Sequence, residues 1–105
     1  MDINGYDFNF AYTVGAYCDI ADLKLGKPRT LADQCKIITQ MAVIMSKAYE
    51  DKQKVADPAY KVRYLTMQEV RALSIDQVVD ELSPEVDAAV AIGQRRTVEA
   101  EAEKN

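Results

Sequence analysis

Histidine is absent from this 105-residue chain, and its absence narrows the chemistry available to the protein. Histidine is the commonest general base and metal ligand in proteins, and the usual hydrolytic triads contain it. The two cysteines, Cys18 and Cys35, are too far apart for a Cys-x-x-Cys metal or redox motif. The sequence therefore predicts no catalytic residue, no metal site and no cofactor, and we expect a protein that is not an enzyme.

Glycine, basic charge and long apolar runs are also scarce. The four glycines are scattered, so no glycine-rich loop is available to cradle a phosphate. The net charge of −4 disfavours binding to nucleic acid or to an anionic membrane surface. No apolar run approaches the roughly 20 residues that a membrane-spanning helix needs, and no signal peptide is visible. We therefore expect a cytoplasmic protein, with both cysteines reduced.

The first ten residues have the pattern of a β-hairpin. Asn4-Gly5 suits a type I′ turn, because both central residues of that turn need a positive φ. The turn pairs Ile3 with Tyr6, and alternate residues then share one apolar face. This face consists of Met1, Ile3, Tyr6, Phe8 and Phe10. An isolated hairpin is marginally stable in water, so the face must cover helices or extend the sheet of another subunit.

A short helix is predicted after the hairpin. Thr13 is its N-cap, and helical spacing continues through Leu23. Its predicted apolar face consists of Val14, Tyr17, Ala21 and Leu25, joined by Cys18 and Ile20. Gly15 lies inside this helix, where it weakens the helix but permits the close approach of another backbone.

A longer helix follows, capped by Thr30 and running to about Lys54. It carries the broadest apolar stripe in the chain, so we expect it to be the central packing element. The stripe consists of Leu31, Cys35, Ile38, Met41, Ala42, Met45 and Tyr49, widened by Ile37 and Ile44. The charged turns from Lys47 onward are expected to stand clear of the core.

Three more helices are predicted after a break at Asp57-Pro58. Capping boxes begin the first two at Thr66 and Ser74, and Ser83-Pro84 gives the third an N-cap followed by proline. The three helices are expected over residues 67–73, 75–82 and 84–102. Their predicted buried residues include Leu65, Val70, Leu73, Val78, Val79 and Leu82, with Val86, Ala89, Val90 and Gly93 on the last helix and Ile92 on its flank.

These elements define the expected fold class as α+β. We predict a helix-rich single domain over residues 1–105, with an N-terminal β-hairpin at 1–10 and about five helices within 13–102. The polar residues 100–105 are expected to fray. Residues 59–65 fit either a strand or a helix, and we favour helix or irregular structure there.

Two apolar surfaces are candidates for binding another polypeptide. Methionines at helical spacing usually fill a core, but they also form adaptable grooves for a partner helix. Aromatic residues of a hairpin are likewise either core or subunit edge, because a short sheet leaves backbone groups unpaired. The candidate partner-binding residues are Met41, Met45 and Tyr49 on the long helix and Tyr6, Phe8 and Phe10 on the hairpin.

Other charged motifs have plainer interpretations. The carboxylate pairs Asp19/Asp22, Asp76/Asp80 and Glu99/Glu103 are interpreted as solvated acids on outward helix faces. Residues 66–82 have the length of a helix-turn-helix, but the second helix carries three acids and no base, which suits DNA poorly.

The order of these segments resembles a known family. "DINGYDFNF" leads into "AYTVGAYCDIADL", the long apolar helix follows, and then come "YLTMQEVRALSIDQVVDEL" and "SPEVDAAVAIGQRRTVEAE". Together they resemble the tail assembly chaperones of long-tailed bacteriophages and prophages, in element order and size more than in invariant residues.

The resemblance implies a non-enzymatic role. Such proteins bind the tape measure protein, help to recruit tail-tube subunits, self-associate and are absent from the finished virion. This chain resembles the short form of the family, which also makes a longer frameshifted form. The alternative that the residues leave open is a small regulatory or antitoxin-like adaptor that binds one folded protein.

Overall fold

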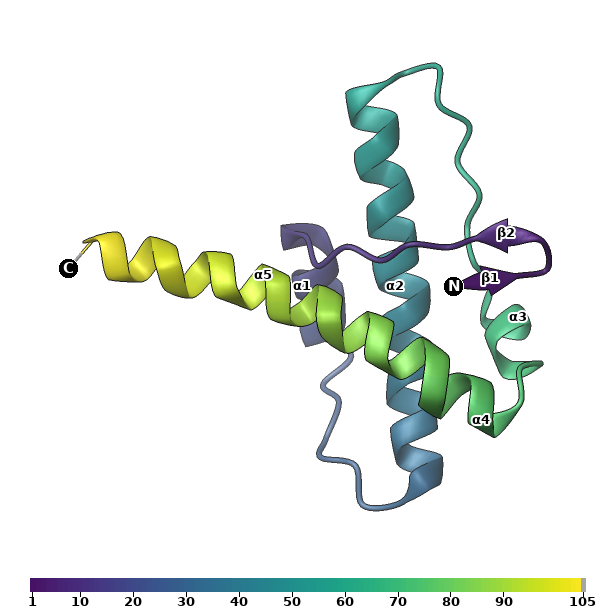
Figure 1. Ribbon diagram of the computed structural model, residues 1–105. Coiled ribbons are helices and arrows are strands. Elements are labelled where there is room, and N and C mark those ends of the chain that lie inside the picture. Colours follow the sequence, from purple (N-terminus) through teal and green to yellow (C-terminus); the bar gives the residue numbers. More distant parts are fainter. Residues whose placement is uncertain (105) are drawn as a thin grey trace.

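A hairpin and a set of helices arranged around one long helix form the fold (Figure 1). The computed structural model describes the backbone of residues 1–104 and the side chains of residues 1–94. Its elements are β1 (Asp2–Ile3), β2 (Tyr6–Asp7), α1 (Val14–Asp22), α2 (Leu31–Ala56), α3 (Met67–Arg71), α4 (Ile75–Gln77), the π-helical turn η1 (Val78–Leu82) and α5 (Ser83–Lys104). The predicted α+β class, a helix-rich domain with an N-terminal hairpin, is confirmed.

The hairpin forms as the sequence predicts. Asn4 and Gly5 have φ values of 54° and 81°, as a type I′ turn requires, and Ile3 pairs with Tyr6. Ile3 and Phe8 are buried in the core. The apolar face of the hairpin therefore covers the helices of its own chain.

The face that α1 buries differs from the predicted one. Thr13 is the N-cap, since its side chain accepts a hydrogen bond from the backbone N–H of Ala16 (3.1 Å). However, Ala16 is the buried residue, whereas Val14 and Tyr17 are 81% and 60% exposed. The small Ala16 side chain is buried in the core where α1 packs on α2. Val14 and Tyr17 therefore face solvent, whereas Ile20, also on the predicted face, is half-buried against the core. Both cysteines are free thiols, and Cys18 is exposed.

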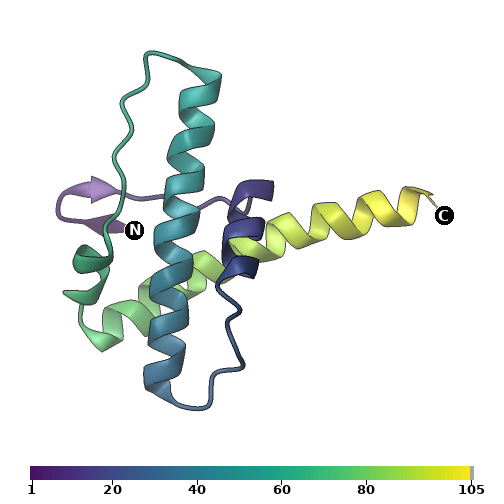
Figure 2. The same ribbon diagram turned by 180° about the vertical axis from the view of Figure 1, so that it is seen from behind.

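The long helix α2 is the central packing element, as predicted. Its N-cap is Thr30, and Ala42 and Met45 are completely buried. The expectation that its turns from Lys47 onward stand clear of the core is wrong at Glu50, which is 2% exposed. The hairpin and the segment between α2 and α3 cover this part of the helix (Figures 1 and 2).

The segment between α2 and α3 is irregular rather than a helix or strand. It returns alongside α2 and buries Leu65 before α3 begins. Both predicted capping boxes are present, at Thr66 with Glu69 and at Ser74 with Gln77.

The last helix begins at Ser83, close to the predicted start, but the predicted N-cap role of Ser83 is wrong, because Ser83 has helical backbone angles and α4, η1 and α5 form one continuous helix. Proline lacks a backbone N–H, and its ring clashes with the carbonyl group four residues earlier. The π-helical turn accommodates Pro84 by widening the helix, so that the Ser83 N–H donates to the carbonyl oxygen of Val78. In the same turn Val78 and Leu82 are buried, whereas Val79, also predicted to be buried, is 42% exposed.

The core is one cluster to which nearly every element contributes. Its buried members are Ile3, Phe8, Ala16, Ala42, Met45, Leu65, Val70, Val78, Leu82 and Val86. In α5, Val86 is fully buried, and Ile92 on the flank is 59% exposed. The predicted frayed tail, residues 100–105, falls where the structure describes no side chains. Among the described residues, no helix is long and apolar enough to cross a membrane.

The close backbone approach expected at Gly15 occurs instead at Gly93. A Cβ atom placed on Gly93 would lie 2.8 Å from Cδ2, 3.0 Å from Cβ and 3.2 Å from the carbonyl oxygen of Tyr12. A Cβ atom on Gly15 would meet only the hydroxyl of Thr13, at 3.8 Å. Gly93 thus lets α5 pack directly against the segment that joins the hairpin to α1.

Alanine substitutions at these two glycines are expected to have opposite effects. Alanine favours a helix over glycine by up to about 1 kcal/mol, which should raise the Tm of Gly15→Ala. In Gly93→Ala, the added methyl group crowds Tyr12, and such overpacking costs about 1–3 kcal/mol, so the Tm should fall. Thermal unfolding followed by circular dichroism checks both. A higher Tm for Gly93→Ala would contradict the close packing of α5 on Tyr12.

Candidate partner-binding site

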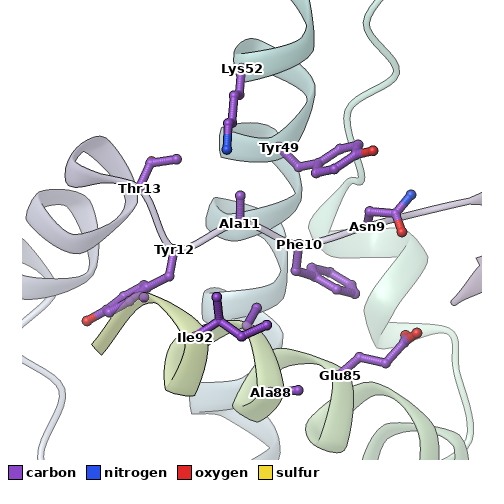
Figure 3. Close-up of a pocket in the computed structure, with 12 residues that line it drawn as sticks. Asn9, Phe10, Ala11, Tyr12, Thr13, Tyr49, Lys52, Glu85, Ala88 and Ile92 are labelled. Carbon is purple, nitrogen blue, oxygen red and sulfur yellow. The ribbon is translucent and has the colours of Figure 1, made fainter. Parts of the chain in front are cut away.

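A surface pocket of about 460 Å³ lies where the segment between β2 and α1 meets α2 and α5 (Figure 3). We call it the Phe10 pocket. Its apolar lining consists of Phe10, Ala11, Tyr12, Ala88, Ala89, Ile92 and Gly93, and its polar lining consists of Asn9, Thr13, Tyr49, Lys52 and Glu85. The segment and α5 cross the same face of α2 (Figures 1 and 2).

The backbone of this segment is anchored along its length. Phe8 is buried at one end, and Thr13 caps α1 at the other. Between them, the N–H of Ala11 donates to the carbonyl oxygen of Met45 in α2 (3.1 Å). Tyr12 packs against the backbone of Gly93 in α5. The backbone that carries Phe10 and Tyr12 is therefore fixed on both sides of these residues.

The side chains divide the pocket into an apolar floor and a polar rim. In Figure 3, Ile92 of α5 lies between the rings of Phe10 and Tyr12, while Lys52 and Glu85 lie on opposite sides. The Glu85 carboxylate is 3.0 Å from the amino group of Met1. Burial, and secondly the repulsion that Tyr17 would exert once ionised, raise the pKa of Tyr12.

A buried carboxylate fixes the hairpin that precedes the pocket. Glu50 accepts hydrogen bonds from the hydroxyls of Tyr6 (2.8 Å) and Tyr60 (2.9 Å) and from the backbone N–H of Arg63 (2.8 Å). We call these four residues the Glu50 cluster. The hydroxyl of Tyr60 is hydrogen-bonded to Tyr6 and to Glu50. These two bonds, that to Tyr6 first, raise the pKa of Tyr60 well above its ordinary value. The cluster joins the hairpin, α2 and the segment before α3.

An ion pair extends this cluster to α3. The guanidinium of Arg63 binds the Glu69 carboxylate with two hydrogen bonds, of 2.7 Å and 3.0 Å, and lies 5.1 Å from the ring centre of Phe8. Asn4 of the hairpin turn donates to the same carboxylate (3.0 Å). The hydrogen bonds from Arg63, and to a smaller extent the one from Asn4, hold the pKa of Glu69 well below its usual range. The hairpin is thereby tied to both α2 and α3.

The six residues predicted from the sequence lie in different environments. Tyr49 and Phe10 both line the Phe10 pocket. Met45 and Phe8 are 0% and 1% exposed, so their assignment as contacts at the surface is wrong for this fold. Met41 is half-buried against the core, and Tyr6 belongs to the Glu50 cluster. The predicted groove of Met41, Met45 and Tyr49 is therefore mostly core.

Sequence reasoning missed several residues of the pocket. Ile92 was visible as an apolar residue on the flank of the last helix, but nothing in the sequence joined it to the hairpin. Tyr12 lies in an irregular segment, where no periodicity identifies its neighbours. Lys52 belongs to a charged turn of α2 that, by sequence, stands in solvent. These residues meet through contacts between segments about 80 positions apart, such as Tyr12 and Gly93.

Within residues 1–94, no group of three histidine, cysteine, aspartate or glutamate side chains is close enough to hold a metal ion. The acids of the predicted pairs Asp19/Asp22 and Asp76/Asp80 are all exposed. The pair Glu99/Glu103 lies outside the residues whose side chains are described. The lining of the Phe10 pocket consists mainly of aromatic rings and small aliphatic groups, with the charged side chains of Lys52 and Glu85 at its rim.

Comparison of this chain with protein-family models, with curated proteins and with solved structures found no match.

Proposed function

We propose that this protein is a phage tail assembly chaperone, a non-enzymatic protein that binds the tape measure protein and helps to recruit tail-tube subunits. The proposal places it in the bacterial host cytoplasm and not in the mature virion. Its support is the resemblance of the sequence in element order, together with the exposed apolar floor of the Phe10 pocket. That floor is the single observation on which the binding role depends.

The chemistry of the pocket suits an apolar helix of another protein. Aromatic side chains bury a large area on contact, and Phe10 and Tyr12 lie on a segment whose backbone is already anchored. Ile92, at 59% exposure, offers apolar surface to a client side chain. The amino group of Lys52 and the hydroxyl of Tyr49 at the rim suit polar groups of the same client.

Many weak contacts along one long client would act together. When several copies bind one chain, each copy raises the effective concentration of the next, so modest affinities give a stable coat. The proposal includes self-association into homo-oligomers, for which the open edges of the short hairpin are available. Light scattering over a concentration series should then show a mass that grows with concentration. A fixed dimer with one stoichiometric folded partner would indicate the regulatory adaptor instead.

Ile92→Asp is expected to abolish the chaperone effect without unfolding the protein. The substitution places a carboxylate on the apolar floor of the pocket, where a client side chain would have to desolvate it. The measurement is the soluble fraction of the tape measure protein on co-expression with each variant. Soluble client should fall to the level seen without chaperone.

Val55→Asp is the matched control, because Val55 is 84% exposed on α2 and does not line the Phe10 pocket. It should preserve client solubility. Unchanged solubility with a folded Ile92→Asp variant would show that the pocket does not bind the client. Gene order gives an independent check, since a tape measure gene is expected immediately downstream and a tail-tube gene upstream.

A further inference from the structure

A second apolar groove lies between the first half of α2 and the α3–α4 region. Its floor consists of Cys35, Thr39, Val70, Leu73 and Val78, and its volume is about 480 Å³. We call it the Cys35 groove. It shares no lining residue with the Phe10 pocket.

The rim of the Cys35 groove exposes large apolar side chains. Ile75 is 60% exposed and Met67 is 38% exposed, although both lie beside the buried Val70 and Val78. Exposed apolar side chains beside a groove, bordered by polar residues, are a feature of interaction sites. Methionine at such a rim adapts its shape to the partner at little cost.

A cation stands on each wall of the groove. Lys36 comes from α2 and Arg71 from α3, and both are exposed. Among the residues whose side chains are described, neither has an ion-pair or hydrogen-bond partner. Charges placed on both sides of an apolar floor select the charge of whatever binds there.

The basic surface continues beyond Lys36. Lys36 also lines a neighbouring hollow of about 700 Å³, together with Lys27 and Arg29. Asp33 is the acid that lines this hollow, and its carboxylate accepts a hydrogen bond from the backbone N–H of Arg29 (3.2 Å). A protein with a net charge of −4 thus places two cations on the Cys35 groove and two more on the adjoining hollow.

We propose that the Cys35 groove binds an amphipathic helix of a partner protein, with an apolar stripe flanked by glutamate or aspartate. The apolar floor suits a helix laid into a groove, and the cations on both walls suit carboxylates on both sides of its stripe. A nucleic acid would use the cations but would leave the apolar floor without a matching surface. The proposal is independent of the chaperone function.

Two synthetic peptides test the charge preference. Both are helices of about 14 residues with one leucine stripe; one has glutamate beside the stripe and the other has lysine. Fluorescence anisotropy should show that the glutamate peptide binds wild-type protein about tenfold more tightly, and added salt should narrow the difference. Equal binding of the two peptides, or binding of neither, would overturn the proposal.

A charge reversal locates the binding to this groove. The double variant Lys36→Glu/Arg71→Glu should reverse the preference and bind the lysine peptide more tightly. The matched control, Lys54→Glu/Lys61→Glu, changes the net charge equally at exposed positions outside both the groove and the Phe10 pocket, and should keep the wild-type preference. Reversal by the control as well would show a net-charge effect and would overturn the proposal.

Alkylation of the two cysteines gives a second readout on the wild-type protein. Cys35 lines the groove, whereas Cys18 is exposed on α1. Saturating glutamate peptide should slow the reaction of Cys35 with iodoacetamide and leave that of Cys18 unchanged. If the peptide does not slow the reaction of Cys35 with iodoacetamide, the proposal is contradicted. An oligonucleotide that binds wild-type protein more tightly than the glutamate peptide and is released by the charge reversal would also contradict it.

Discussion

Glu50→Ala is expected to be one of the two most damaging substitutions in this protein. It leaves the hydroxyls of Tyr6 and Tyr60 and the backbone N–H of Arg63 without the acceptor that now binds all three. An unsatisfied buried polar group costs about 1–3 kcal/mol. The two half-buried hydroxyls remain 3.2 Å apart and can still bond to each other, so the free energy of unfolding should fall by about 3 kcal/mol. For a domain of this size the Tm should fall by more than about 10 °C. Thermal and urea unfolding measure both quantities.

Asp51→Ala is the matched control for this prediction. Asp51 is the next residue of α2, and its carboxylate pairs with Lys47 (2.8 Å) and accepts a hydrogen bond from the hydroxyl of Tyr64 (2.5 Å) at the surface, where the Asp51 side chain is 43% exposed. A surface ion pair contributes about 0–1 kcal/mol, so Asp51→Ala should unfold close to the wild-type midpoint. Equal losses of stability for the two alanine variants would contradict the structural role of the Glu50 cluster.

Met45→Asp is expected to abolish folding. Met45 is completely buried in α2, so the substitution places a carboxylate inside the core without a partner. An uncompensated charge buried in a core costs several kcal/mol, and the cavity left by the shortened side chain adds a further cost. The total stability of a small domain is only about 5–15 kcal/mol. Far-UV and near-UV circular dichroism should show loss of the native spectrum at room temperature.

Val55→Asp is the control that separates the burial of a charge from the mere presence of an added aspartate on α2. Val55 lies on the same helix and is 84% exposed, so its aspartate variant should keep the native spectrum and a cooperative transition. A folded Met45→Asp protein with a wild-type melting curve would show that Met45 does not lie in the core. Such a result would restore the groove of Met41, Met45 and Tyr49 as a partner surface.

The features that were predictable are those encoded in short stretches of sequence. The Asn4-Gly5 turn, the N-caps at Thr13 and Thr30 and the capping boxes at Thr66 and Ser74 all depend on residues within a few positions of one another. Local hydrogen bonds and backbone preferences decide them, so the sequence identifies them directly. The α+β class follows from the same signals.

The errors occurred where two alternatives satisfied the local rules equally well. Helix α1 has apolar residues on more than one side, and close packing of Ala16 on α2 selected the smaller face. Ser83-Pro84 fits a helix start, yet a π-helical turn lets the helix continue through it. In each case, the packing of the whole chain selected an arrangement that the local sequence merely allowed.

The candidate site shows the same division more strongly. Phe10 and Tyr49 were recognised as candidates from their own segments, but the pocket also needs Tyr12, Lys52 and Ile92. The contact between Tyr12 and Gly93 depends on how α5 crosses α2, which no periodicity reveals. The Cys35 groove likewise arises from the meeting of α2 with α3 and α4.

By itself, the sequence determined which segments become hairpin and helix, where most of them begin, and which types of chemistry are scarce. Those properties follow from interactions between near neighbours in the chain. The tertiary structure alone decided which faces are buried, that Glu50 lies in the core as an acceptor for three donors, and where the exposed apolar surfaces gather. Burial is shared among distant segments that compete for the same space, so it is settled only when all of them pack together.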